Sequence, residues 1–171
     1  MRMWQFSELN HVADKNGWTK FVSMQNGYSL LYGEEEREMN AYCNYHGIGL
    51  IPWSPLREGD LARTLGISTL RKEAMTAAFK GTVHEINTTV TEADRQIIMR
   101  TMELSKKKGR TMGQVALAWL GPKVASPIVG MSSIEHVDQS NVTGKMLTAE
   151  EMRYLEEPYV PILILIDPDQ Y

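Results

Sequence analysis

The stretch Gly47-Ile-Gly-Leu-Ile-Pro-Trp-Ser-Pro-Leu56 has the pattern of a buried strand that ends in an aromatic residue, a Ser-Pro break and a loop. In α/β proteins the ligand site lies where the carboxyl ends of strands open into loops. The stretch therefore predicts an α/β fold with a candidate site after a strand at Gly49–Trp53. Nothing upstream of this strand has the pattern of the acid, base or nucleophile that a catalytic site would need.

The order helix, glycine, strand occurs twice in the first third of the chain. A helical pattern over Trp4–Asn16 stops at Gly17 and leads into a short strand at Phe21–Gln25. The acidic run Glu34–Glu38 predicts the solvated first turn of a second helix, which Gly47 ends. This spacing is that of βα units and predicts parallel strands joined by crossover helices.

A third unit follows an insertion at Arg57–Val90 that is rich in glycine, threonine and charge. The expected elements after it are helices at Glu92–Lys108 and Thr111–Leu120, a strand at Ser126–Gly130, a helix at Ile134–Ser140, and a last helix opened by a capping box at Thr148–Glu151. No composition shift marks a second domain, so residues 1–171 are expected to form one domain. Three units are too few for a closed (β/α)₈ barrel, which takes roughly 250 residues.

Composition excludes several classes of function. A net charge of −3 gives no reason to expect nucleic acid or a membrane as partner. Cys43 is the only cysteine, which excludes a disulfide framework and favours a cytoplasmic location. His11, His46 and His84 have no spacing that suggests a metal site. The apolar run Ile162–Ile166 in the tail 161–171 is far shorter than the roughly 20 residues that span a bilayer, and it either packs on the body as a strand or is an exposed liability.

Six ordered blocks resemble the aldo-keto reductase family, and most closely its fungal and bacterial aryl-alcohol dehydrogenase-like branch. The blocks are Trp4–Phe6, Phe21–Leu31, Glu34–Met39, Gly49–Leu56, Gln114–Leu120 and Pro127–Ser133. The resemblance covers about residues 4–160. It implies a partial (β/α)₈ TIM barrel, corresponding to the last three strand–helix units of an NADP(H)-dependent reductase of aldehydes and ketones.

The resemblance also implies where a cofactor would bind. Gln25 matches the glutamine that holds the nicotinamide carboxamide, with Asn26 beside it, and Trp53 matches the aromatic residue that stacks on the nicotinamide. The loop matched to the pyrophosphate contains Ser54, Pro55, Leu56, Gly59 and Leu61. The segment matched to the adenosine 2′-phosphate contains Gly130, Ser132, His136, Gln139 and Ser140.

The family's catalytic tyrosine, lysine, aspartate and histidine lie on earlier strands, so no catalytic residue is assigned here. Four positions depart from the family pattern, among them Gly33 in place of a commonly charged residue and Ser140 where asparagine is frequent. Gly27 stands where a bulkier polar residue is usual, and His136 stands where arginine is frequent. The change at His136 would weaken a fixed charge on the 2′-phosphate.

Each assignment has a structural alternative. Without the resemblance, Trp53 reads as a core aromatic, Gln25 as a loop cap, Ser54–Leu56 as a strand-ending turn, and His136 as a surface histidine. For the whole chain, two further hypotheses stay open besides the reductase. One is a non-catalytic partner protein of the same barrel family, with open strand edges that pair with another copy or another chain. The other is an unstable fragment without function. A complete barrel would take a small carbonyl substrate.

Overall fold

The computed structural model describes residues 1–67, 70–81, 89–131 and 133–162. Ser132, His84 and the tail from residue 163 lie outside the described residues. In chain order the elements are α1 (Met3–Lys15), β1 (Ser23–Met24), the 3₁₀ helix η1 (Glu34–Arg37), α2 (Met39–His46), β2 (Gly49–Leu50), η2 (Arg57–Ala62), α3 (Leu70–Phe79), α4 (Glu92–Lys108), α5 (Met112–Leu120), η4 (Gly121–Lys123), α6 (Ile134–Ser140) and α7 (Ala149–Glu156).

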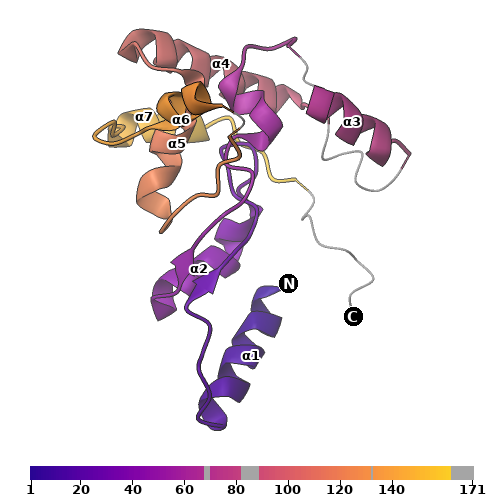
Figure 1. Cartoon of the computed structure of the whole chain (residues 1–171), viewed down its shortest axis with the longest axis vertical. Helices are drawn as coiled ribbons and strands as arrows, with labels where there is room; N and C mark the ends of the chain where they lie inside the picture. Colours follow the sequence, from indigo (N-terminus) through magenta and orange to yellow (C-terminus); the bar gives the residue numbers. More distant parts are fainter. Residues whose placement is uncertain (68–69, 82–88, 132, 163–171) are drawn as a thin grey trace.

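The elements divide into a part with the strands and a part made of helices. In Figure 1, α1, α2 and the two strands occupy the lower part of the view, and α4 to α7 gather in the upper part. Helix α3 lies apart at the right. In the part of the chain that the structure describes, no helix is both long and apolar enough to cross a membrane.

β1 and β2 pair in parallel, as predicted, although each is shorter than expected. Ser23 lies opposite Gly49 and Met24 opposite Leu50. A further parallel bridge, between Gly27 and Trp53, keeps the same register. Residues 23–27 and 49–53 therefore run side by side over their whole length.

The third predicted strand is a hydrogen-bonded neighbour of β2 rather than a regular strand. The N–H groups of Ala125 and Ser126 donate to the carbonyl of Leu50 at 2.9 and 3.3 Å, and Ile128 N donates to the carbonyl of Pro52 at 2.8 Å. Donor and acceptor numbers rise together, so this segment also runs parallel to β2. Pro52 has no N–H to return, which removes a rung of the ladder and explains why no strand forms.

Local end signals place the helices well. Helix α4 begins at Thr91, whose side chain accepts from Asp94 N, and ends at Gly109 in the left-handed conformation with φ 59°. Helix α7 begins with the predicted capping box between Thr148 and Glu151. In both helices the signal is contained within one turn of chain, and tertiary packing does not override it.

The acidic run is where the prediction is wrong. Glu34 to Arg37 form a separate 3₁₀ helix, and Glu38, whose φ of −138° is not helical, separates it from α2. Glu34 is buried instead of solvated. Its Oε1 accepts from the hydroxyl of Tyr159 at 2.8 Å and from the backbone N–H of Ile162 at 2.9 Å. A long-range contact has replaced the helix-dipole role expected of this carboxylate.

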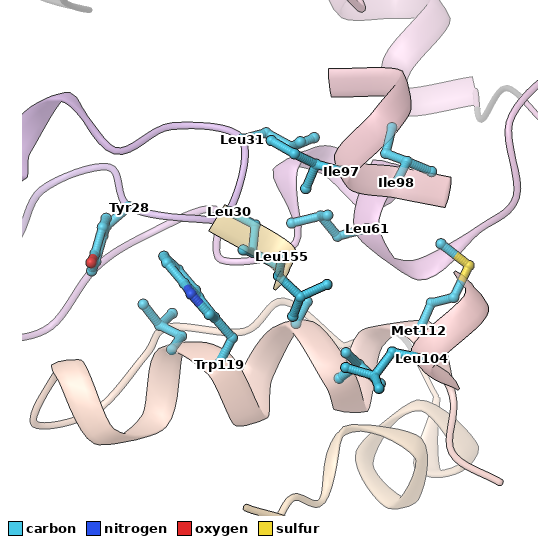
Figure 2. Packing of buried hydrophobic residues seen from close by; sticks show 13 residues of the cluster. Tyr28, Leu30, Leu31, Leu61, Ile97, Ile98, Leu104, Met112, Trp119 and Leu155 are labelled. Atoms are coloured by element: carbon cyan, nitrogen blue, oxygen red, sulfur yellow. The ribbon is translucent and has the colours of Figure 1, made fainter. Parts of the chain in front are cut away.

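The main core surrounds α5, whose nine residues are all buried. Figure 2 shows Leu61, Leu155 and Trp119 converging with residues of α4 and of the segment 28–31. That segment forms a turn bridged between Ser29 and Tyr32, and residues 28–32 are buried. A smaller cluster of Phe6, Met39, Cys43 and Leu50 joins α1 and α2 to β2, and Cys43 is fully buried in it.

Candidate functional site

The carboxyl ends of the parallel segments meet at one edge of the sheet. Trp53 N donates to the carbonyl of Asn26 at 2.8 Å, and Tyr28 N donates to the carbonyl of Trp53 at 3.4 Å. The hydrogen bond from Ile128 to Pro52 brings the segment that leads to Gly130 to the same edge. The residues predicted around Gln25, Trp53 and Gly130 therefore start from neighbouring segments.

Register decides which side chains share a face of the sheet. Because successive side chains alternate and paired residues point to the same side, Gln25 and Trp53 belong to one face. Gln25 is exposed, and the side chain of Trp53 is 41% exposed. The other face is covered, with Leu50 and Pro52 buried. An amide and an aromatic ring are thus presented together on the uncovered face.

Asn26 belongs to the covered face. Its Nδ2 donates to Oδ1 of Asn40 on α2 at 2.7 Å, and both side chains are buried. Oδ1 of Asn26 and Nδ2 of Asn40 have no hydrogen-bond partner among the described residues. The side chain of Asn26 ties the end of β1 to α2, on the face opposite Gln25.

Gly27 and Trp53 are in direct contact. A Cβ atom added to Gly27 would lie 3.0 Å from Cζ2 of Trp53, which is tighter than nine in ten real Cβ contacts. The indole therefore uses the space that a side chain at position 27 would need. This contact gives a physical reason for the glycine at a position where the family pattern has a bulkier residue.

The loop after β2 has an unusual backbone. Ser54, Arg57 and Glu58 have φ angles of 51°, 44° and 52°, in the left-handed region that residues with a Cβ seldom adopt. Gly59 follows with φ 97°, and the guanidinium of Arg63 lies where its side chain would be. Each such non-glycine residue costs of order 1 kcal/mol, which tertiary contacts must offset.

The five residues predicted in this loop divide into core and surface. Leu61 is fully buried, Pro55 is buried, and Leu56 packs against the main core. Ser54 is half-buried, and its Oγ donates to Oε1 of Glu58 at 3.0 Å. The apolar members thus anchor the loop, and its polar groups gather around Ser54.

Sequence reasoning missed Arg57 and Glu58. Nε of Arg57 lies 3.8 Å from Oε2 of Glu58, with side-chain exposures of 12% and 18%. Arg57 Nη1 also donates to the carbonyl of Leu31 at 3.5 Å, which links this loop to the segment after β1. An adjacent base and acid in a loop matched to a phosphate would have been the signal to look for.

The segment from Gly130 to Ser140 lies mostly at the surface. Gly130, His136 and Gln139 are exposed, Ser140 is half-buried, and Ser132 is outside the described residues. Nε2 of Gln139 donates to Oε1 of Glu135 at 2.9 Å. The carbonyl of Gln139 accepts from Oγ1 of Thr111 at 3.3 Å, which places the end of α6 against the start of α5.

Two buried tyrosines, Tyr28 and Tyr159, donate hydrogen bonds to carboxylates within the fold. Burial, followed by the hydrogen bond to Glu36, raises the pKa of Tyr28. Burial likewise raises the pKa of Tyr159, which donates to Glu34 and accepts from Gly33 N at 2.9 Å. Both phenols stay protonated at neutral pH, and each donates to a carboxylate, so neither is placed to give a proton to a ligand on the open face.

Comparison with known proteins identifies what the chain is similar to. A sequence model of the Aldo/keto reductase family matches residues 2–159. The chain is 43% identical to an aldo-keto reductase of Fusarium vanettenii, covering 93% of this chain and 43% of that protein. It is 44% identical to a versiconal hemiacetal acetate reductase of Aspergillus parasiticus, covering 94% and 47%. It is 43% identical to a putative aryl-alcohol dehydrogenase of Schizosaccharomyces pombe, covering 96% and 49%. The chain spans slightly less than half the length of these curated relatives.

The contact between Gly27 and Trp53 generates a prediction. Gly27→Ala should destabilise the chain by about 1 kcal/mol, because the new methyl group must push the indole aside by a few tenths of an ångström. Urea unfolding measures the loss, and tryptophan emission reports the displaced ring. Gly130→Ala is the matched control, since a Cβ there would meet nothing within 4 Å. Equal stability of the two variants would contradict the prediction.

Proposed function

Because the chain belongs to the aldo/keto reductase family, we propose that it forms the cofactor-binding part of an NADP(H)-dependent reductase of aldehydes or ketones. On this proposal its parallel segments correspond to the last three strand–helix units of the family's (β/α)₈ barrel. The observation that carries it is the register that presents Gln25 and Trp53 on one uncovered face.

The residues at the carboxyl edge suit the nicotinamide end of the cofactor. An exposed amide can pair with a carboxamide, donor to acceptor and acceptor to donor. A flat aromatic face can stack on the ring and leave its other side open. Gln25 and Trp53 would supply these two contacts, and the bound cofactor would supply the hydride.

The residues proposed for the phosphate end come from the loop after β2 and from the segment 130–140. Ser54 and Arg57 offer a hydroxyl and a fixed cation beside the loop matched to the pyrophosphate. Gly130, Ser132, His136, Gln139 and Ser140 are proposed for the 2′-phosphate on the resemblance. Helix α6 adds the acidic side chains of Glu135 and Asp138 to this region, so the preference for NADP(H) over NAD(H) depends on His136 and on uncharged donors.

The proposal assigns the proton-delivering step elsewhere. In the family a tyrosine hydroxyl protonates the carbonyl oxygen, on a strand before the residues matched here. The cytoplasm is the proposed location, because Cys43 is a free thiol and a reducing compartment keeps it so. A small carbonyl compound is the proposed substrate of the complete barrel.

A second candidate role, association with another copy of this chain, has one observation in its favour. The β1 segment accepts hydrogen bonds from the β2 segment along one side, through Val22 O from Gly49 N and Met24 O from Ile51 N. The backbone groups of Ser23 and Gln25 point to the opposite side, where no described strand pairs with them. Phe21 and Val22 beside this edge are exposed, and an uncovered edge with apolar neighbours favours pairing.

The first prediction is that the purified chain binds NADPH. Gln25→Ala and Trp53→Ala should each raise the dissociation constant about tenfold, through loss of the amide pair and of the stacking surface. Isothermal titration calorimetry measures both. Gln96→Ala and Trp4→Ala are matched controls, because both side chains are exposed and belong to helices rather than to the paired segments. Undetectable binding by the unmodified chain would refute the proposal.

The second prediction is that the 171-residue chain does not oxidise NADPH by itself. The expected rate with a broad panel of aldehydes and ketones is that of buffer, because the proposal places the proton-delivering tyrosine on a strand that precedes the residues matched here. Absorbance of NADPH measures the rate, with a full-length fungal relative as the positive control. Turnover above buffer by the chain would overturn the assignment of the acid to another segment.

The third prediction concerns association through the edge of β1. Light scattering after size exclusion should give a dimer mass for the chain and a monomer mass for Ser23→Pro. Proline removes the outward N–H at position 23 and leaves the hydrogen bonds to β2 intact. Ser23→Ala keeps the N–H and should remain dimeric. A monomeric unmodified chain would remove this second role.

A further inference from the structure

The carboxylate of Glu58 contacts the hydroxyl of Ser54 and the guanidinium of Arg57 in the loop after β2. Its two carboxylate oxygens are divided between two partners, with Oε1 accepting from Ser54 Oγ at 3.0 Å and Oε2 lying 3.8 Å from Arg57 Nε. A hydroxyl and a guanidinium around one anion form the kind of donor set that binds a phosphate oxygen. Here the anion is a side chain of the loop itself.

The backbone is shaped to make these contacts. Ser54, Arg57 and Glu58 all have positive φ, and this turn returns the chain so that position 58 faces position 54. The side chains of Arg57 and Glu58 are 12% and 18% exposed, so solvent screens their attraction only partly. The cost of three left-handed residues is offset in part by this internal ion pair.

We infer that the Glu58 carboxylate is an internal anion that competes with a diphosphate for Ser54 and Arg57, and so sets the affinity of the chain for its dinucleotide. This inference rests on the proposed function, because it takes the loop as the site of the cofactor's pyrophosphate. A diphosphate that enters must displace the carboxylate from both donors and then remain close to its negative charge. Glu58 therefore weakens binding twice, by occupation and by repulsion.

The competing explanation is that Glu58 is only a counter-ion that stabilises the loop. Both explanations expect Glu58→Gln to destabilise the unliganded chain, because a buried guanidinium loses a charged partner. They differ in what happens to ligand affinity. A counter-ion alone gives no gain, whereas a competitor gives tighter binding when it is removed.

The test compares the full chain with Glu58→Gln and Glu58→Ala. Calorimetry measures the dissociation constant of NADPH and, separately, that of adenosine 2′-monophosphate, which has no diphosphate. Thermal unfolding without ligand reports the stability. Glu73→Gln is the control, because it removes the same charge from an exposed site on α3. Glu73 follows Lys72, whose Nζ contacts the carboxylate of Asp60 in the loop after β2.

The expected result is a decrease of about tenfold in the NADPH dissociation constant for Glu58→Gln, at least as large a decrease for Glu58→Ala, and none for Glu73→Gln. Adenosine 2′-monophosphate should bind all four proteins equally, and the melting temperature without ligand should fall in both Glu58 variants.

The two ways of failing are distinct. If the unmodified chain binds NADPH and neither Glu58 variant binds it more tightly, the inference is wrong and the proposed function stands. If no variant binds NADPH, both are wrong. An equal gain for adenosine 2′-monophosphate would also overturn the inference, because it would show a general charge effect rather than competition for the diphosphate donors.

Discussion

The parallel register between residues 23–27 and 49–53 is the constraint on which the candidate site depends. Ser23 pairs with Gly49, and the same offset recurs at Gly27 and Trp53. A shift of one residue would move Trp53 to the face packed on α1 and α2, and would leave Gln25 without an aromatic neighbour. The register is held from the covered face, where Leu50 packs in the core cluster with Phe6 and Met39. Burial on one face thus decides what is presented on the other.

Helix ends were the most predictable part of the fold because their signals are local. Thr91 and Gly109 bound α4 as the sequence indicates, since a capping hydroxyl and a left-handed glycine act within one turn. The acidic run at Glu34 could not be predicted in the same way. Its carboxylate is bound by Tyr159, 125 positions along the chain, and no local rule reports such a partner. The predicted third strand does not form as a regular strand, because Pro52 has no N–H to donate to it.

The candidate site was predictable where it follows strand order and not where it depends on contacts through space. Gln25 and Trp53 could be assigned to strand ends from the pattern around them, and the structure places both at the same edge. The contact between Trp53 and Gly27 was visible in the sequence only as a departure from a family pattern. The pair Arg57 and Glu58 was visible in the sequence only as an adjacent base and acid, because the contact of Glu58 with Ser54 depends on positive φ angles that the sequence does not indicate.

Two of the predicted polar ligands have the same local arrangement. Ser54 donates to Glu58 and Gln139 donates to Glu135, each pair four positions apart. In both, a carboxylate of the chain satisfies a donor that is proposed for a phosphate, so entry of the ligand exchanges one hydrogen bond for another and adds like-charge repulsion. Gln25 and Trp53 differ, because the described residues provide no such carboxylate on the open face. Gln25 and Trp53 can therefore contact the nicotinamide without giving up a hydrogen bond within the protein. The net binding free energy of the dinucleotide then depends on how much is lost at the phosphate end, where the carboxylates must be displaced.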